Sequence, residues 1–186
     1  MDSQHQTNSI MYPLQTERTM LSLLVEQDLP DMEAMARETD TFKYLKKFQA
    51  MTADEYTRFL QTKLEQIRTG TGYHWAVRLK TDEQFIGAVN LNPIKGTSKL
   101  QIGCQLKKDF WNRGFASELM ARLLEFGIQE LGLPAVYGVF QKENSASRKL
   151  LEKLGFVFEE GFQEQEVEVE VYKYAAPGPH TDQLNL

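Results

Sequence analysis

Hydrophobic residues between positions 116 and 131 recur with the period of an amphipathic helix. Charged and polar side chains occupy the opposite side, and the apolar positions are Ala116, Leu119, Met120, Leu123, Leu124, Gly127, Ile128 and Leu131. Spacings of three and four residues place such a set on one helical face. Gly132 and Pro134, which are typical of a helix end, come next. The pattern therefore predicts a core-facing helix over residues 116–131.

Two further helices are predicted before it. Residues 29–38 start a helix, with Pro30 and Asp31 near its beginning. Residues 52–68 start with Thr52 and Glu55 in the spacing of a capping box, in which each residue satisfies a backbone N–H of the other. Their apolar side chains then form one helical stripe.

Strand-like segments occupy most of the remaining N-terminal half. They comprise a first strand at 16–24 and a meander at 73–79, 84–94 and 99–106. The short turns KTDEQ and KGTS join the last three runs, so we expect neighbouring antiparallel strands.

After the 116–131 helix the sequence predicts a strand at 135–140, a helix at 145–154 and a β-rich end at 156–174. A strand, loop, helix and strand in this order form a right-handed crossover, so the strands on either side of the helix should run parallel. With no internal repeat and no second core, we expect one α+β domain over residues 14–175, with flexible tails at 1–13 and 176–186.

Composition narrows the function classes. The chain has 186 residues, 41% of them hydrophobic, and a formal net charge of −5, which argues against nucleic-acid binding and is compatible with a cationic amine substrate. No apolar run is long enough to cross a membrane and no signal peptide is evident, so we expect a cytoplasmic protein without membrane contact. The single cysteine, Cys104, excludes an internal disulfide and a four-cysteine zinc site, and no metal is expected.

The loop WNRGFA at 111–116 is the candidate for chemistry. Gly114 can aim successive backbone N–H groups into one concavity at a helix start, Ala116 permits close approach, and Arg113 adds positive charge. This arrangement favours a phosphate-bearing cofactor. A glycine before a helix is more often simply a turn, and the loop matches neither the dinucleotide-binding nor the P-loop pattern.

Other segments give this loop a context. In order they are TERTMLSLL, FIGAVNL, LQIGCQL, FWNRGFASELM and ENSASRKLLEKLGF. Together they resemble the GNAT superfamily of acyl-CoA-dependent N-acyltransferases, within it the RimJ/RimL-like branch. The resemblance covers about residues 14–175. It implies the GNAT fold: a mixed central sheet with antiparallel N-terminal strands, a splayed parallel pair at 100–106 and 135–140, and flanking helices.

The resemblance also implies a site for acetyl-CoA. The family loop Q/R-x-x-G-x-G/A, which holds the diphosphate, falls on 111–116, with Trp111 in place of Gln or Arg and Asn112 where many members have Gly. The implied cofactor contacts are Asn112, Arg113, Gly114, Phe115, Ala116 and Ser117 around the loop, Cys104, Gln105 and Leu106 along the pantetheine arm, and Asn144 and Ser147 at the next helix. Cys104 could alternatively be a nucleophile, but its place within a hydrophobic strand favours a buried small residue.

Ser147 and Glu166 are the catalytic candidates. By resemblance Ser147 lies near the CoA sulfur. Many members carry a Tyr one turn later, where this chain has Leu151, so either Ser147 protonates the leaving thiolate or the thiolate, with an alkyl thiol pKa of about 8.5, leaves unaided. Alternatively Asn144 or Ser145 caps the helix and Ser147 bonds back to the backbone.

The run FQEQEVEVEVYKY alternates glutamates with valines, as a strand with one solvated face would. Glu166 has the distance from Ser147 at which RimL-like enzymes carry a proposed base. Glu166 is therefore our candidate to deprotonate the amine, although a solvated face over a valine-lined core is the simpler explanation of the pattern. We expect His74 to pack at a strand edge rather than to act in catalysis.

The expected partners are acetyl-CoA and a primary amine, with the chain acting as a monomer or homodimer. The acceptor is either a protein N-terminal amine or a small amine such as an amino acid, polyamine or antibiotic. A third alternative is a module that binds acyl-CoA without catalysis.

Overall fold

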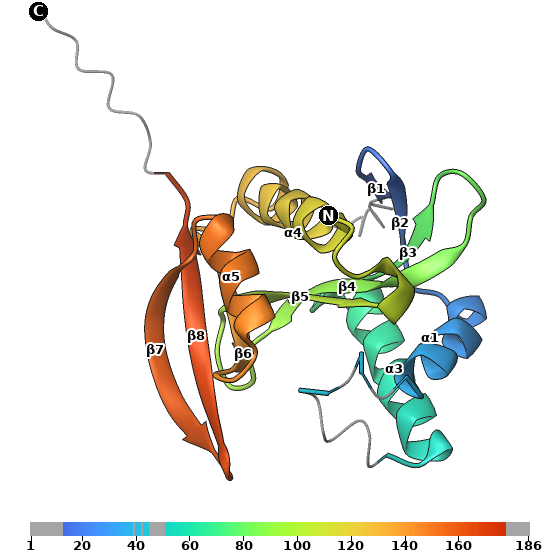
Figure 1. Cartoon of the computed structure of the whole chain (residues 1–186), viewed down its shortest axis with the longest axis horizontal. Helices are drawn as coiled ribbons and strands as arrows, with labels where there is room; N and C mark the ends of the chain where they lie inside the picture. The colour runs from blue at the N-terminus through green and yellow to red at the C-terminus, as the bar shows by residue number, and fades with distance from the viewer. Residues whose placement is uncertain (1–12, 39, 42, 45–50, 178–186) are drawn as a thin grey trace, which may run out of the picture.

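An eight-stranded sheet forms the centre of the molecule, with the strand order β1-β2-β3-β4-β5-β6-β8-β7 (Figure 1). The computed structural model describes residues 13–38, 40–41, 43–44 and 51–177. The strands are β1 (Leu14–Gln15), β2 (Thr19–Leu23), β3 (Tyr73–Leu79), β4 (Phe85–Pro93), β5 (Leu100–Leu106), β6 (Ala135–Gln141), β7 (Val157–Glu164) and β8 (Val167–Ala175). Neighbouring strands are antiparallel except β5 and β6, which are parallel as predicted.

Helices cover both faces of the sheet (Figure 1). They are α1 (Leu29–Ala36), α3 (Ala53–Arg68), α4 (Phe115–Glu125) and α5 (Ser145–Lys153), with short turns η1 (Glu26–Asp28), η2 (Lys108–Phe110) and the π-helical η3 (Phe126–Glu130). α1 and α3 pack through Met35 and Leu60 on the face that presents Ala76 and Ala88. α4 and α5 close the larger core around Trp75, Phe126 and Leu151. The predicted α+β class, with a mixed sheet, one parallel strand pair and flanking helices, is confirmed.

Several elements begin and end at or within one residue of the positions that local sequence signals predict. β3 has the predicted bounds, and β4 and β5 lie within one residue of theirs at each end. The capping box before α3 is present: the Thr52 N–H donates to Glu55 Oε2 at 2.8 Å, and the Glu55 N–H donates to Thr52 Oγ1 at 3.3 Å. Gly132 adopts the left-handed conformation, φ 65°, that ends the long helix.

Two predicted elements differ in extent. The first strand, expected at 16–24, is the shorter β2, and the two-residue strand β1 precedes it across a turn that contains Arg18. The helix expected at 116–131 is α4 followed by the wider turn η3. At Gly127 a Cβ would lie 3.0 Å from Val136 Cγ2 of β6, so the end of this helix approaches the sheet too closely for a larger residue.

The glutamate-rich end is a hairpin, which corrects the placement of Glu166. β7 and β8 pair antiparallel from Glu164↔Val167 outward, and the turn between them holds Gln165, at φ 55°, and Glu166. Glu166 is therefore exposed in a turn rather than one of a row of glutamates on a single strand face. The valines of β8 face the interior as predicted, with Val169 and Val171 buried.

Other expectations concern the chain ends and membranes. Most of each tail, predicted at 1–13 and 176–186, lies outside the described residues. Ala176 is described, and its N–H donates to the Pro134 carbonyl at 2.9 Å. Across the described part of the chain no helix is long and apolar enough to cross a membrane.

Candidate active site

Strands β5 and β6 touch at one point and then diverge. Their parallel pairing is confined to Gln101↔Tyr137, whereas β5 pairs with β4 and β6 pairs with β8 along their whole lengths. Beyond Gln101, no strand from the part of the chain that the structure describes lies between the facing edges of β5 and β6. The splayed pair expected from the resemblance is therefore present.

Alternation along β5 determines which backbone groups face this gap. The Lys107 N–H donates to the Ile86 carbonyl of β4 at 2.9 Å, and the Gln105 carbonyl lies against Gly87 of the same strand. In an antiparallel pair the intervening residues point their N–H and C=O groups the other way. Cys104 and Leu106 therefore present backbone groups to the gap, whereas the Gln105 carbonyl points toward β4.

The Leu106 carbonyl at the end of this edge already has donors. It accepts a hydrogen bond from Trp111 Nε1 at 2.7 Å and another from Thr41 Oγ1 at 3.2 Å. The first ties the start of the loop to β5, and the second ties the segment after α1 to the same point. At this end of β5 the Cys104 N–H and C=O and the Leu106 N–H face the gap and can pair with a ligand.

The loop before α4 has the geometry of an anion site. Asn112 and Gly114 both have positive φ, 57° and 83°, and Gly114 occupies the N-cap position of α4. Among the described residues, no protein acceptor is recorded for the backbone N–H groups of residues 112–117. We call these groups the N–H cradle. Successive free N–H groups at a helix start carry partial positive charge and suit a phosphate.

The side chains of the loop fall into two kinds. Phe115 is buried, 3% exposed, and meets Phe110 at a ring-centroid distance of 5.9 Å, so it fastens the loop to the core. Arg113 is exposed and folds over both rings, as expected of a charge at the rim. Ala116 and Ser117, in the first turn of α4, are half-buried and small.

The next helix start supports the capping interpretation of Asn144. Its Oδ1 accepts the Ser147 N–H at 3.1 Å, which satisfies one free N–H at the beginning of α5. The Ser147 hydroxyl is half-buried, and within the described residues it has no recorded partner, so the expected bond back to the backbone is not seen. α5 follows β6, and its first turn therefore stands at the end of one wall of the gap.

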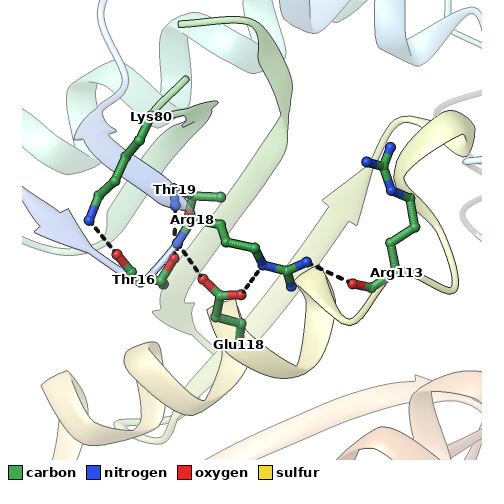
Figure 2. A network of polar contacts seen from close by, with 6 residues as sticks. All are labelled: Thr16, Arg18, Thr19, Lys80, Arg113 and Glu118. Carbon is green, nitrogen blue, oxygen red and sulfur yellow. Dashed lines mark hydrogen bonds and ion pairs between the residues drawn. The ribbon is translucent and has the colours of Figure 1, made fainter. Parts of the chain in front are cut away.

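Arg18 joins this site from far away in the chain, and no sequence pattern pointed to it. Its Nε donates to Glu118 Oε2 at 2.7 Å, its backbone N–H donates to Glu118 Oε1 at 2.9 Å, and its Nη1 donates to the Arg113 carbonyl at 3.0 Å (Figure 2). The turn that carries Arg18 is held in place because Lys80 Nζ donates to the Thr16 carbonyl at 2.6 Å. No local pattern could indicate a contact between residues 100 positions apart.

Comparison with known proteins bears on this arrangement. A family model described as an acetyltransferase (GNAT) domain matches residues 18–157. The chain belongs to the GNAT acetyltransferase family. It is therefore an acyltransferase enzyme, and enzymes of this family use acetyl-CoA.

Relatives support the assignment. The chain is 25% identical over 148 residues to an uncharacterised N-acetyltransferase of Bacillus subtilis, YoaA, covering 78% of this chain and 84% of that protein. The fold is similar to that of RimL, a ribosomal L7/L12 alpha-N-protein acetyltransferase solved with coenzyme A (TM-score 0.75, 16% identity, 87% and 96% of the two chains). It is also similar to a spermidine N-acetyltransferase from Vibrio cholerae solved with CoA and spermine (TM-score 0.71, 20% identity, 84% and 95%).

The thiol of Cys104 in this GNAT enzyme is unsuited to nucleophilic attack. Burial raises its pKa to about 12, so the thiol is neutral near pH 7. A neutral thiol is a poor nucleophile, and the side chain packs against the main core. The structure thus favours the interpretation of Cys104 as a packing residue.

Leu151, which stands where many GNAT enzymes have Tyr, has a structural role here. It is 3% exposed, and its side chain lies against Gly138 of β6 so closely that a Cβ on Gly138 would collide with it. No acid is available at this position. The Ser147 hydroxyl, one turn earlier, is the described α5 hydroxyl that is both half-buried and without a recorded partner.

The glutamates of the hairpin have different environments. Glu170 pairs with Arg148 of α5 at 2.8 Å and Glu168 pairs with Lys142 at 2.7 Å. Arg148 therefore ties α5 to β8. Glu164 and Glu166 are exposed, and no ion pair is recorded for either among the described residues.

His74 is buried on an interior strand, β3, rather than at a strand edge. Burial, reinforced by the charge of Lys63, lowers its pKa to about 3, and its Nε2 lies 2.9 Å from Gln66 Oε1 of α3. It is neutral near pH 7 and packs against a helix. Among the residues that the structure describes, no group of three or more His, Cys, Asp or Glu side chains could hold a metal ion.

Proposed function

We propose that this GNAT acetyltransferase moves the acetyl group of acetyl-CoA directly to a primary amine. The observation that carries the proposal is the N–H cradle at the end of an open strand edge. The cradle suits the diphosphate, and the pantetheine arm, which is rich in amides, would pair with Cys104 and the Leu106 N–H as an added strand. The thioester would then lie near the Ser147 hydroxyl.

In the proposed reaction the neutral amine attacks the thioester carbonyl. A C–N bond forms, the C–S bond breaks, and the attacking nitrogen releases its extra proton to water. The thiolate takes a proton from water, either directly or through Ser147, which water then reprotonates. The amine must first lose a proton, since its pKa is about 8 for an α-amine and above about 10 for a lysine-type amine. Glu166, exposed in the β7–β8 turn, is the proposed base.

The first test concerns the donor. Acetyl-CoA should raise the melting temperature, and Gly114→Asp should abolish the shift because a carboxylate would stand at the cradle. Gly132→Asp is the matched control, since Gly132 also has positive φ, lies beyond the other end of the helix, and would have no atom within 4 Å of an added Cβ. No shift in the parent protein would refute the donor assignment.

The second test concerns catalysis. Turnover of acetyl-CoA should fall about 10²–10⁴-fold in Glu166→Gln and measurably in Ser147→Ala. Glu164→Gln, on the same hairpin, and Ser145→Ala, exposed in the same helical turn, are the controls and should leave turnover unchanged. Unchanged rates in the first two variants would remove both residues from the mechanism.

For the acceptor we propose a protein N-terminal amine, as in the RimJ/RimL-like branch. The similarity to RimL supports this choice, and the similarity to a spermidine N-acetyltransferase supports the small-amine alternative. One feature favours the alternative: a hollow of about 290 Å³ beside the loop is lined by Glu38, Asp40, Asp109 and Lys108, with more negative than positive charge.

A panel of N-terminal peptides, amino acids and polyamines distinguishes these acceptors. Turnover with peptides alone supports the first choice. Turnover with polyamines that weakens in Asp109→Asn supports the second. Binding of acetyl-CoA without turnover on any amine would indicate a non-catalytic module.

A further inference from the structure

We infer that Arg18 is a positioning residue for the diphosphate loop. It binds the carbonyl side of the peptide between Arg113 and Gly114, and so turns the Gly114 N–H on the other side toward the place of the diphosphate. This inference rests on the proposed acetyl-CoA site. Arg18 lies in the turn between β1 and β2, whereas the loop lies between β5 and α4. Its guanidinium packs on the Phe115 ring, with Cζ 3.9 Å from the ring centroid.

The direction of one peptide unit carries the argument. The Arg113 carbonyl and the Gly114 N–H belong to the same peptide bond, and no peptide bond in the described chain is cis. In a trans peptide these two groups point in opposite directions. Because Arg18 Nη1 holds the Arg113 carbonyl at 3.0 Å, the Gly114 N–H must point away from Arg18. Gly114 permits this because its φ of 83° lies in the left-handed region.

Glu118 holds the guanidinium in the required orientation. Its two oxygens accept the backbone N–H and the Nε of Arg18, at 2.9 and 2.7 Å, while its own N–H donates to the Gly114 carbonyl at 3.1 Å. Although burial raises the pKa of Glu118, hydrogen bonds from Thr16 and Arg18 hold that pKa below its usual value. Figure 2 shows Arg18 between Glu118 and the Arg113 carbonyl. Because the Glu118 N–H also donates to the Gly114 carbonyl, the carbonyl groups on both sides of the Gly114 N–H are held by the same two residues.

Arg18 also removes a competitor from the site. Glu118 lies in the first turn of α4, where a carboxylate is attracted to the same free N–H groups as a phosphate. The ion pair with Arg18 keeps this carboxylate on the far side of the loop. A lysine could supply the positive charge. It lacks the planar guanidinium, which hydrogen-bonds to Glu118 and the Arg113 carbonyl and packs on the Phe115 ring at the same time.

The test compares two thioester donors. Acetyl-CoA carries the diphosphate, whereas acetyl-pantetheine lacks it and uses only the gap between β5 and β6. In Arg18→Ala we expect CoA binding, measured by calorimetry, to weaken at least about tenfold, the loss expected for a charge-assisted hydrogen bond. The kcat/KM for acetyl-pantetheine should stay within about twofold, since its binding does not involve the loop.

Three further variants separate positioning from charge and from folding. Arg18→Lys keeps the charge, should fold, and should still bind CoA weakly. Arg18→Ala/Glu118→Ala removes both charges and should remain weak, whereas a purely electrostatic role would restore affinity. Arg122→Ala breaks ion pairs with Glu125 and Glu130 on the same helix away from the loop and should bind CoA as the parent does.

Each remaining outcome overturns the inference. Parent-like CoA affinity in Arg18→Ala and Arg18→Lys would show that the loop needs no such support. An equal loss with both donors would show a general structural effect, and recovery in the double variant would show a charge effect. If the parent protein binds no CoA, the proposed function itself is refuted. If the parent and the Arg18 variant bind CoA equally well, only the role of Arg18 is refuted.

Discussion

The indole N–H of Trp111 donates to the carbonyl of Leu106 at 2.7 Å, five residues back along the chain. This bond joins the last residue of β5 to the first residue of the loop that carries the cradle. The strand edge and the cradle therefore have a fixed relative position, which a ligand that spans both would require. Trp111 is 38% exposed.

Trp111→Phe removes the donor and keeps an aromatic ring. We expect a loss of about 0.5–1.5 kcal/mol in the free energy of unfolding, because Thr41 still donates to the Leu106 carbonyl. CoA affinity should fall by a larger factor than that of the short donor acetyl-pantetheine. Urea unfolding and calorimetry measure the two effects, and equal losses with both donors would contradict a role in joining the two parts of the site.

Gly138→Ala should destabilise the protein by about 1–3 kcal/mol, because the added Cβ would collide with the Leu151 side chain. Combining it with Leu151→Val, which shortens the opposing side chain, should recover part of this loss. Thermal unfolding of the two single variants and the double variant gives the coupling. Strict additivity would indicate that the two residues do not meet.

Cys104→Ala should keep most of the activity, since the pKa of this thiol, raised to about 12 by burial, leaves it neutral during turnover. In the folded protein, alkylation by iodoacetamide at pH 8 should be much slower than in urea. Direct attack by the amine also predicts initial-rate patterns without a ping-pong form. A burst of acetylated Cys104 would instead establish a covalent intermediate.

His74 should make the fold sensitive to mild acid. Its pKa is about 3 in the folded protein and near the ordinary value of 6.5 when unfolded. Between these values the unfolded chain binds the extra proton, so stability is highest above pH 6.5 and falls as the pH drops toward 3, by up to about 1.4 kcal/mol per unit.

The variant His74→Gln, which can still hydrogen-bond to Gln66, should flatten this part of the profile. Urea unfolding of both proteins between pH 5 and pH 8 isolates the contribution, because the carboxylates are common to the two. Parallel profiles would show that His74 binds its proton equally well in the folded and unfolded states.

Much of the fold could be predicted because its elements carry local signals. The period of the α4 residues, the Thr52–Glu55 capping box and the Gly132 helix end each depend on a few neighbouring residues, and each is present. The cradle could be placed for the same reason, since Gly114 and the start of α4 are adjacent in the sequence.

What could not be predicted depends on distant partners or on turns without a marker. Gln165 adopts positive φ although it is neither Gly nor Asn, so the alternation of glutamates gives no sign of the turn that holds Glu166. The orientation of Gln105 depends on its register with β4, and the contact of Arg18 depends on a turn at the other end of the domain. None of these has a signature within a short window.

The contact between Gln101 and Tyr137 has a consequence for the molecule as a whole. The strands β1–β5 and the strands β6–β8 form two half-sheets that pair with each other at this one position. The pantetheine arm of the donor would add a second connection between them. On the proposed function, the protein is then least rigid at the moment when it has released CoA. The exchange rates of the Cys104 and Leu106 amide hydrogens would show whether the pantetheine arm is bound. The stability of the enzyme would therefore rise with the concentration of its own substrate.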